Sequence, residues 1–255
     1  MAHYLLAMGG KTSNEIKLSV VIPCYNEGKN IDLVVNRFLE VKPNNINVEL
    51  ILVDNGSIDN SHKIIANYAK KYSFIKSLHI NKNIGYGNGV WQGLKNSKGE
   101  YLCWTHADMQ TDLADTIKAY EMAIGQKNSK KCFVKGNRKK RLLFDNFFAL
   151  GMSIFETIML GKILYDINAQ PNLFHRSFLN KIKNPPMDFS FDLYLYYLAN
   201  EFNYKIIRFP VSFQKRIHGE SHWSTTINGK WKFIKRTMNF TFKLKKKLKN
   251  ADNNP

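Results

Sequence analysis

The sequence is poor in acidic residues, in cysteine and in long apolar runs. Among its 255 residues, 20 Asp and Glu stand against 38 Lys and Arg, which gives a formal net charge of +18. This excess favours an anionic partner such as a lipid headgroup, a nucleic acid or a sugar phosphate, and charge alone does not choose among them. The cysteines Cys24, Cys103 and Cys132 lack the spacing of a metal site, which is typical of reduced cytosolic thiols.

No segment has the length and apolarity of a membrane span. The longest candidate, residues 147–164, contains Glu156 and Lys162, whose charges would be costly in hydrocarbon. The first ten residues are apolar but short, and they lack the basic start of a signal peptide. We therefore expect a cytoplasmic protein, soluble or peripheral on a membrane, in which residues 1–16 are a disordered or artificially added leader.

Apolar strands alternate with helical stretches through the first half of the chain. This order predicts a mostly parallel, doubly wound α/β sheet, and a hydrophobic fraction of 44% is enough to fill its core. Asn30 is expected to cap the first helix. The predicted strands are 18–23, 48–53, 77–80 and 100–104, and the predicted helices are 30–39, 61–72 and 91–96.

Polar residues follow the first two strands at the point where each ends. Asp54 ends the second strand, and a polar turn ends the first. Ligands of open α/β sheets bind at the carboxyl edge, so two such ends side by side can hold one nucleotide. The residues of the first turn that we expect to contact it are Pro23, Tyr25, Asn26 and Glu27.

A glycine run, Gly85-x-Gly-x-Gly89, follows the third predicted strand. Its spacing does not match the dinucleotide fingerprint, which argues against a dehydrogenase. Closely spaced glycines let a backbone approach a ligand or open a helix where phosphate can bind. The alternative is a loop that needs positive φ, and the sequence leaves both interpretations open.

Several short motifs follow one another along the chain between Leu18 and Trp223. In order they are Pro23-x-Tyr-Asn-Glu27, Val53-Asp-Asn-Gly-Ser-x-Asp59, Asn83-x-Gly-x-Gly87, Gly99-Glu-Tyr-Leu102, His106-Ala-Asp-Met-Gln110, Val134-Lys-Gly-Asn-Arg138, Phe189-Ser-Phe-Asp192 and Arg216-x-x-Gly-x-Ser221. Each motif is weak alone, but the ordered set resembles family 2 glycosyltransferases of the GT-A fold. The branch it resembles most is the dolichol-phosphate mannose synthase type, which moves a sugar from a nucleotide diphosphate to a polyprenyl phosphate.

The resemblance implies a Rossmann-like GT-A domain over residues 17–224. Its central sheet is expected to be mostly parallel and flanked by helices, with a small antiparallel addition and amphipathic helices near the acceptor side. Residues 225–255 are expected to form a basic amphipathic C-terminal tail.

The resemblance also implies roles at the donor site. Asp54 and the 23–27 turn would hold the base and ribose, and Gly85 would approach the nucleotide. Asp108 and Gln110 would hold Mn²⁺ or Mg²⁺, because a divalent cation neutralises the departing diphosphate. Arg216 and Ser221 belong to a loop that lies over the diphosphate in the family, where Arg216 would bind phosphate oxygens as a fork.

Two positions depart from the family pattern. His106 stands where the family has the first of two paired carboxylates, and Asn55 stands where it usually has Asp. Histidine ligates Mn²⁺ but serves Mg²⁺ poorly. His106 therefore leaves open a Mn²⁺-preferring enzyme, a weak-metal enzyme aided by basic residues, or a degenerate transferase.

The acceptor side is predicted from a later region. The resemblance makes Arg138 and Arg141 phosphate binders, and the apolar stretch 142–159 forms either an interfacial amphipathic helix or a core helix. An acceptor phosphate is already anionic and attacks directly, whereas a sugar hydroxyl needs a carboxylate to take its proton. Asp192 and Asp188 are the candidate carboxylates, and Asp192 is alternatively a residue that orients an arginine or sugar.

Beyond Trp223, lysines interleave with aromatic residues over 230–236 and 242–249. This pattern fits an anionic membrane surface, single-stranded nucleic acid or a solvated helix, and we favour the membrane over nucleic acid because the chain also has a candidate lipid-phosphate site. The expected function is an inverting, metal-dependent glycosyltransferase that uses a nucleotide-diphosphate sugar and a polyprenyl phosphate at the cytoplasmic membrane face. The alternatives are transfer to a sugar hydroxyl of a glycan and a catalytically weak nucleotide-binding scaffold.

Overall fold

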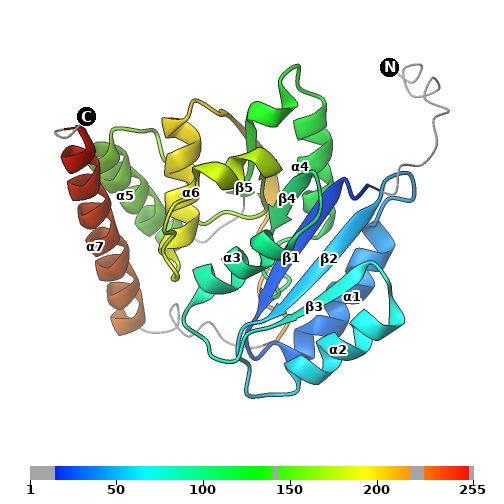
Figure 1. The fold of residues 1–255 in the computed structure, drawn as a ribbon. Helices are drawn as coiled ribbons and strands as arrows, with labels where there is room; N and C mark the ends of the chain where they lie inside the picture. The colour runs from blue at the N-terminus through cyan, green and yellow to red at the C-terminus, as the bar shows by residue number, and fades with distance from the viewer. Residues whose placement is uncertain (1–14, 140–142, 219–226, 253–255) are drawn as a thin grey trace.

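The computed structural model describes residues 15–139, 143–218 and 227–252 of the chain. Within them, one seven-stranded sheet has the order β3-β2-β1-β4-β6-β5-β7 (Figure 1). Every strand runs in the same direction except β6, which is antiparallel to both neighbours, β4 and β5. The strands are β1 (Leu18–Cys24), β2 (Val48–Asp54), β3 (Ile75–His79), β4 (Tyr101–Trp104), β5 (Cys132–Lys139), β6 (Asn172–His175) and β7 (Lys205–Ser212).

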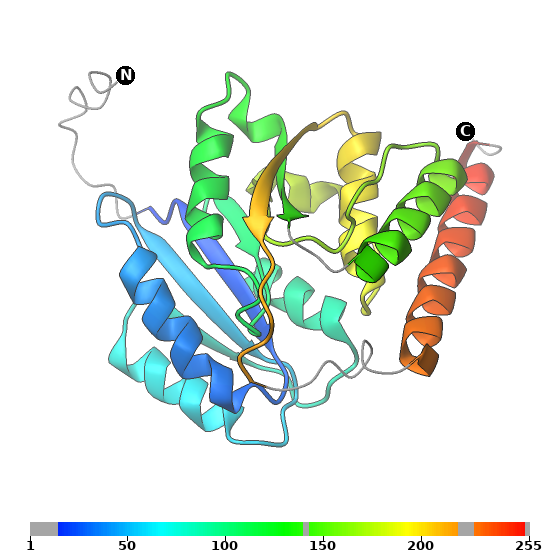
Figure 2. The ribbon, with the colours of Figure 1, turned by 180° about the vertical axis from the view of Figure 1, so that it is seen from behind.

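The central strands are apolar on both faces because helices cover both. Val20 and Ile22 of β1 belong to one core cluster and Val21 to the other, as expected when successive side chains point to opposite faces. Helices α1, α2 and α4 pack on the first face and α3 and α6 on the second, as opposite views show (Figures 1 and 2). A Cβ at Gly93 of α3 would collide with Val21, so the missing side chain lets this helix lie close to β1.

The last long helix packs against α5 and α6 rather than standing apart. Thr241 of α7 donates to buried Glu156 of α5 at 2.6 Å, and Phe242 meets Phe155 edge to face with ring centroids 6.1 Å apart. Together, α5 and α7 lie at the opposite side of the molecule from β3 (Figure 1). The helices are α1 (Gly28–Val41), α2 (Ser61–Lys71), α3 (Tyr86–Asn96), α4 (Ala114–Ile124), α5 (Leu143–Leu160), α6 (Ser190–Glu201) and α7 (Ile227–Asp252), with 3₁₀ turns η1 (Ser129–Lys131) and η2 (Arg176–Lys181).

The expected parallel α/β sheet and its small antiparallel addition are confirmed. The prediction that Asn30 caps the first helix is wrong, since α1 begins at Gly28 and Asn30 is buried inside it. Helix α3 starts at Tyr86, five residues before the predicted start, and Gly87 and Gly89 lie in its first turns. The helix predicted over 142–159 is present as α5. The division of the chain at 16/17 and 224/225 stays a prediction.

Among the described helices, none combines the length and apolarity needed to cross a bilayer.

Candidate functional site

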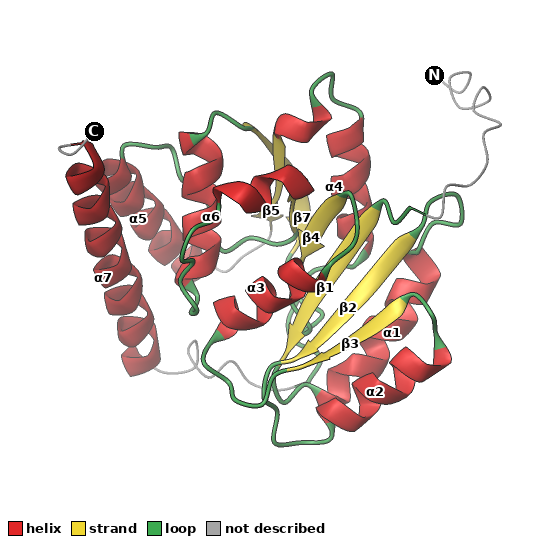
Figure 3. Ribbon diagram, in the orientation of Figure 1, coloured by secondary structure: helices red, strands yellow, loops and turns green. Residues whose placement is uncertain are grey.

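The carboxyl ends of β1, β2 and β4 meet at one edge of the sheet, where their loops gather (Figure 3). Asp54 pairs in register with Cys24 at the end of β1. On the other side of β1, Thr105 N donates to Val21 O at 3.1 Å and starts the loop that carries Asp108. Since β2 and β4 flank β1, this edge is where the strand order reverses, the usual ligand position in such sheets.

The turns after β1 and β2 are fastened to each other. Asn26 adopts φ 56°, a left-handed conformation that Asn tolerates better than most residues. Its backbone N donates to Ser57 Oγ at 3.0 Å, and its side-chain oxygen accepts from Ile58 N at 2.9 Å. Gly28 N donates to Asp59 Oδ2 at 3.0 Å. The two turns therefore form one rigid wall, on which Tyr25 is 40% exposed.

Asp54 is completely buried below that wall, and hydrogen bonds engage both of its oxygens. Ser57 N donates to Oδ1 at 2.9 Å, whereas His79 Nδ1 lies 2.8 Å and His62 Nδ1 3.3 Å from Oδ2. Within the described part of the chain, this is the one cluster of three His, Cys, Asp or Glu ligand atoms, all within 4.8 Å of one another. Sequence reasoning missed both histidines, although His79 ends a parallel strand in register with Asp54, the same signal that identified Asp54.

Asp108 forms a second acidic centre beyond the end of β4. It is 2% exposed, accepts from Gln110 N at 3.1 Å and pairs with Arg216 Nη2 at 2.9 Å. His106 Nδ1 lies 4.0 Å from the same carboxylate. Burial raises the pKa of Glu27, and the nearby Asp108 charge raises it further, while the hydrogen bond from Asn30 opposes both effects. Acids and cations thus share a compact space at the edge of the sheet.

Arg216 reaches Asp108 because the segment after β7 lies across the 108–110 loop. Gln214 N donates to Gln110 O at 2.8 Å, and Gln110 Nε2 donates to Gln214 O at 3.0 Å. The structure therefore brings together the predicted residues Asp108, His106 and Arg216. Gln110 uses its amide N–H to hold the crossing segment, and Ser221 lies outside the described residues.

His106 also connects to a buried polar network. Its Nε2 lies 3.2 Å from the hydroxyl of Tyr86, which accepts a 3.3 Å hydrogen bond from Gln170 Nε2. The same amide donates to Asp192 Oδ2 at 2.9 Å, and Trp104 Nε1 donates to Asp192 Oδ1 at 3.0 Å. Asp192 is 2% exposed, so both of its oxygens are occupied inside the fold. Its predicted role as a general base stays a prediction.

Lys135 is the cation of this network. It is fully buried, and its amine donates to Ala169 O at 2.8 Å and to Asn172 Oδ1 at 2.7 Å. Burial lowers the pKa of Lys135 to about 7, opposed by the charge of Asp192. Burial likewise raises the pKa of Asp192, and Lys135 opposes that shift. Each of the two charges therefore opposes the pKa shift that burial causes in the other, while both groups bond neutral partners inside the fold.

Gly85 allows a backbone conformation and a close approach that other residues would not. Its φ is +133°, and a Cβ there would collide with the carbonyl oxygen of Met187, so the positive-φ interpretation describes what is seen. Asn88 N in the first turn of α3 donates to that same carbonyl at 3.0 Å. Asn55 Nδ2 donates to Gly85 O at 3.0 Å, a bond that the aspartate usual at this position could not form. The role of Gly85 toward a nucleotide stays a prediction.

Arg138 is bound within the fold. Its guanidinium pairs with Asp166, its side chain is 9% exposed, and it lies 5.2 Å from the ring centroid of Phe213. Asp166 also accepts from Arg138 N at 2.9 Å. This carboxylate already neutralises the guanidinium, so the acceptor-phosphate role of Arg138 stays a prediction. Arg141 lies outside the described residues.

Solved structures share this fold. Glucosyl-3-phosphoglycerate synthase from Mycobacterium tuberculosis, in complex with Mn²⁺, UDP and phosphoglyceric acid, matches with a TM-score of 0.70 and 14% identity over 90% of this chain and 78% of that one. Mannosyltransferase PcManGT from Pyrobaculum calidifontis, with GDP-Man and Mn²⁺, matches with a TM-score of 0.61 and 16% identity over 84% of this chain and 60% of that one. These likenesses confirm the expected GT-A architecture.

Curated relatives are similar in sequence. Dolichyl-phosphate beta-glucosyltransferase of Dictyostelium discoideum is 27% identical over 219 residues, which cover 78% of this chain and 67% of that protein. Cholesterol galactosyltransferase of Borreliella burgdorferi is 29% identical over 158 residues, 57% of this chain and 42% of that protein. This chain spans about half the length of further dolichyl-phosphate beta-glucosyltransferases from Trichomonas vaginalis.

The family model described as glycosyl transferase family 2 matches residues 19–152, more than half of the chain. That range contains the rigid turns after β1 and β2, the buried Asp54, and the loop that carries His106 and Asp108. With the fold and the relatives in agreement, the chain is a glycosyltransferase and belongs to glycosyltransferase family 2.

Proposed function

We propose that this glycosyltransferase moves a hexose from a nucleoside-diphosphate sugar to the phosphate of a long-chain lipid of the polyprenyl phosphate class. Relatives named for transfer to dolichyl phosphate support the acceptor class. An acceptor phosphate oxygen forms the new bond to the anomeric carbon while the bond from that carbon to the diphosphate breaks. A single displacement of this kind inverts the anomeric configuration and releases the nucleoside diphosphate.

The donor is proposed to bind along the edge formed by β1, β2 and β4. The base and ribose would lie on the wall that contains Asp54, Tyr25 and Asn26. The diphosphate would lie near Asp108, where Arg216 supplies a fork of N–H donors suited to phosphate oxygens. Because Arg216 already neutralises Asp108, a diphosphate would compete with that carboxylate for the guanidinium.

The hydrogen bonding of Asp192 is the observation that supports a phosphate acceptor over a sugar hydroxyl. A sugar hydroxyl must lose a proton as it attacks, but a phosphate monoester is already charged at neutral pH. Both oxygens of Asp192 accept hydrogen bonds from Trp104 and Gln170 inside the fold, so the residue is poorly placed to take a substrate proton. This arrangement favours an acceptor that needs no general base.

The donor atoms at His106 and Asp108 fit a divalent cation. Their Nδ1 and Oδ2 atoms lie 4.0 Å apart and would hold the ion, and the mixed nitrogen and oxygen donors suit Mn²⁺ better than Mg²⁺. Such an ion would stabilise the charge that develops on the leaving diphosphate. Structural relatives are bound to Mn²⁺ or Mg²⁺, which supports metal use by this fold.

Helices α5 and α7 are proposed to rest on an anionic membrane surface. Leu150, Ile154 and Ile158 recur every four residues along α5 and are 50%, 51% and 72% exposed. On α7, Trp231 and Phe242 are 65% and 50% exposed among lysines. An exposed apolar stripe beside a basic helix is typical of proteins that lie in the membrane interface.

The test is a transfer assay with purified protein, Mn²⁺, a panel of nucleotide sugars, and either a polyprenyl phosphate or a glycan acceptor. We expect a polyprenyl-phosphate sugar as the product and no sugar transfer to the glycan. Product on the glycan alone would replace the proposal with transfer to a sugar hydroxyl. Nucleotide binding without turnover on any acceptor would support the scaffold. For the membrane contact, sedimentation with anionic vesicles should weaken in Ile154→Ser/Ile158→Ser and persist in the exposed control Ile58→Ser.

A further inference from the structure

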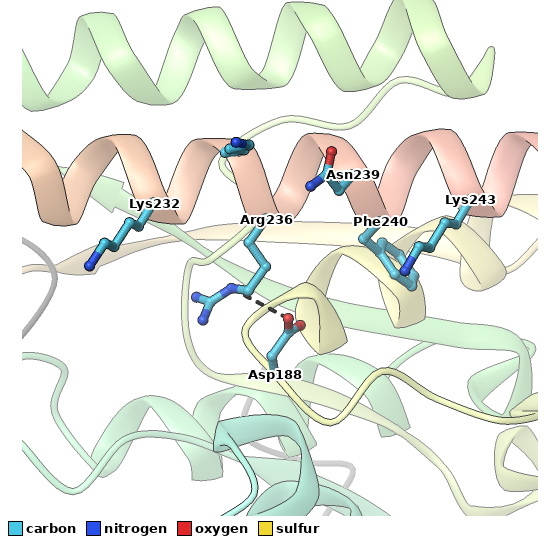
Figure 4. A pocket seen from close by; sticks show the side chains of 7 residues that line it. Asp188, Lys232, Arg236, Asn239, Phe240 and Lys243 are labelled. Carbon is cyan, nitrogen blue, oxygen red and sulfur yellow. Dashed lines mark ion pairs between the residues drawn. The ribbon is translucent and has the colours of Figure 1, made fainter.

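A cavity of about 390 Å³ lies between α7 and the turn that precedes α6 (Figure 4). This volume is within the range of small-molecule sites in proteins. One wall is the carboxylate of Asp188. The other wall is formed by α7 residues, namely Lys232, Lys235, Arg236, Asn239, Phe240 and Lys243.

The cavity wall follows one stripe of α7, in which Phe240 also packs edge to face on Tyr194 of α6. Residues 232, 236, 240 and 243 are three or four positions apart, the spacing of neighbours along one helix face, and Figure 4 shows them on the same side of α7. Thr241 instead turns to α5, where it bonds Glu156. The basic stripe therefore faces the cavity while another face anchors the helix.

The charge of the lining is strongly positive, with four cations against one carboxylate. Asp188 is already engaged, since Arg236 Nε lies 3.3 Å from its Oδ2 and Ser190 N donates to its Oδ1 at 2.8 Å. Among the residues that the structure describes, no ion pair involves Lys232, Lys235 or Lys243, whose side chains are exposed. Three ammonium groups are thus available to an anion.

A chain of contacts connects the cavity to the donor edge. The guanidinium of Arg236 lies 5.2 Å from the ring centroid of Phe189, and Phe189 stacks on Tyr86 with centroids 4.9 Å apart and planes 7° from parallel. The Tyr86 hydroxyl is 3.2 Å from His106 Nε2. The stacked rings of Phe189 and Tyr86 therefore lie between the cationic cavity and His106.

We propose that this cavity binds the phosphate monoester of the acceptor, with the lysines holding its oxygens and Phe240 contacting the first apolar carbons. The inference rests on the proposed function and assigns its acceptor site to α7. A phosphate monoester carries nearly two negative charges at neutral pH and three acceptor oxygens, which matches three lysines beside an apolar ring. Arg138, whose guanidinium is bound to Asp166, is not needed for this role.

The first experiment measures steady-state kinetics with a short-chain isoprenyl phosphate in detergent. Lys235→Ala and Lys243→Ala should each raise the KM for this acceptor about tenfold, with kcat and the donor KM unchanged, because each removes one charge-assisted hydrogen bond. The matched control is Lys246→Ala, an exposed lysine of α7 outside the lining. Asp188→Asn should lower the acceptor KM severalfold, since it removes the one negative charge among the described lining residues. An unchanged acceptor KM in all cavity variants would overturn the proposal.

The second experiment measures binding without turnover, so that the acceptor site is tested apart from the activity. Calorimetric titration with the isoprenyl phosphate should show weaker binding for Lys235→Ala and Lys243→Ala than for Lys246→Ala. If the wild type binds this ligand through the cavity but glycosylates no lipid phosphate, the proposed function fails and the phosphate site stands. If the cavity variants lose only sedimentation with anionic vesicles and bind the isoprenyl phosphate normally, the cavity is a headgroup contact and the inference is wrong.

Discussion

The donor edge and the α7 surface handle charge in opposite ways. At the edge, each acid of the site has a partner: Asp108 has Arg216, and Asp54 has two imidazoles. Along the cavity face of α7, lysines extend without ion pairs among the described residues. The edge is therefore preorganised by short hydrogen bonds, whereas the helix presents uncompensated charge. The net charge of +18 therefore combines two kinds of cation. Arg216 is neutralised by a carboxylate inside the fold, whereas the cavity lysines of α7 have no ion pair among the described residues.

The largest effect is expected from Asp108→Asn. This change removes the carboxylate that both His106 and Arg216 face, and with it the cation site that we propose beside the diphosphate. We expect kcat to fall by at least about 100-fold, the size typical of losing one main electrostatic contact in a transition state. Transfer assays with saturating Mn²⁺ and donor measure it.

Asp112→Asn is the matched control, since Asp112 belongs to the same loop but pairs with Arg37 at 2.8 Å and accepts from Ala114 N at 3.0 Å. We expect a lower unfolding temperature with kcat kept. Equal losses of kcat in both variants would mean that the fold of the loop, not the Asp108 carboxylate, matters to catalysis. The donor edge would then owe its role to its conformation and not to its paired charges.

The sequence predicted the first half of the fold because each signal there is local. Buried parallel strands such as β1 and β2 read as continuous apolar runs, and a polar residue at each end marks the binding edge. The antiparallel β6 was not located, since its four residues, which lead directly into η2, carry no distinct period. The packing of α7 on α5 could not be predicted either, because it depends on Thr241 and Glu156, which are distant in the chain.

The site was predicted less completely than the fold. Motifs identified Asp54, Asp108 and Arg216. In the structure, Asp54 ends β2, Asp108 follows β4, and Arg216 pairs with Asp108 from the segment after β7. Sequence reasoning could not foresee that Arg138 is neutralised by Asp166 or that Tyr86 bridges His106 to a buried network. Both facts depend on pairings between residues tens of positions apart, which a single sequence does not show.

A smaller effect, on stability, is expected from Glu156→Gln on the helix side. Burial raises the pKa of Glu156 to about 7, so the folded protein favours its neutral form. Between about pH 4.5 and 7 the unfolded chain loses a proton that the folded chain keeps, so stability falls as pH rises through this window. Glutamine mimics the neutral form, and we expect it to raise the free energy of unfolding by about 1–3 kcal/mol at pH 8 and by less at pH 5.

Urea unfolding at both pH values measures this change. Glu201→Gln is the control, because Glu201 forms an exposed ion pair with Lys162 at 3.0 Å and its loss should change stability by less than about 1 kcal/mol. Equal gains at pH 5 and pH 8 for Glu156→Gln would contradict the buried-carboxyl explanation. The activity should not change, since the Thr241 hydrogen bond that anchors α7 can be kept by the amide oxygen.

The smallest effect is expected from His106→Asp, which tests the junction between the two regions. The substitution adds a second carboxylate beside Asp108 and removes the contact with Tyr86. Oxygen ligands suit Mg²⁺, so the ratio of Mg²⁺-supported to Mn²⁺-supported rates should rise about tenfold if the imidazole occupies a ligand position. His175→Asp, on β6 opposite the start of β4, lies at the other edge of the sheet and should leave the ratio unchanged. A constant ratio in both variants would mean that His106 acts through Tyr86 alone, which would make it a positioning residue between the donor edge and the acceptor side.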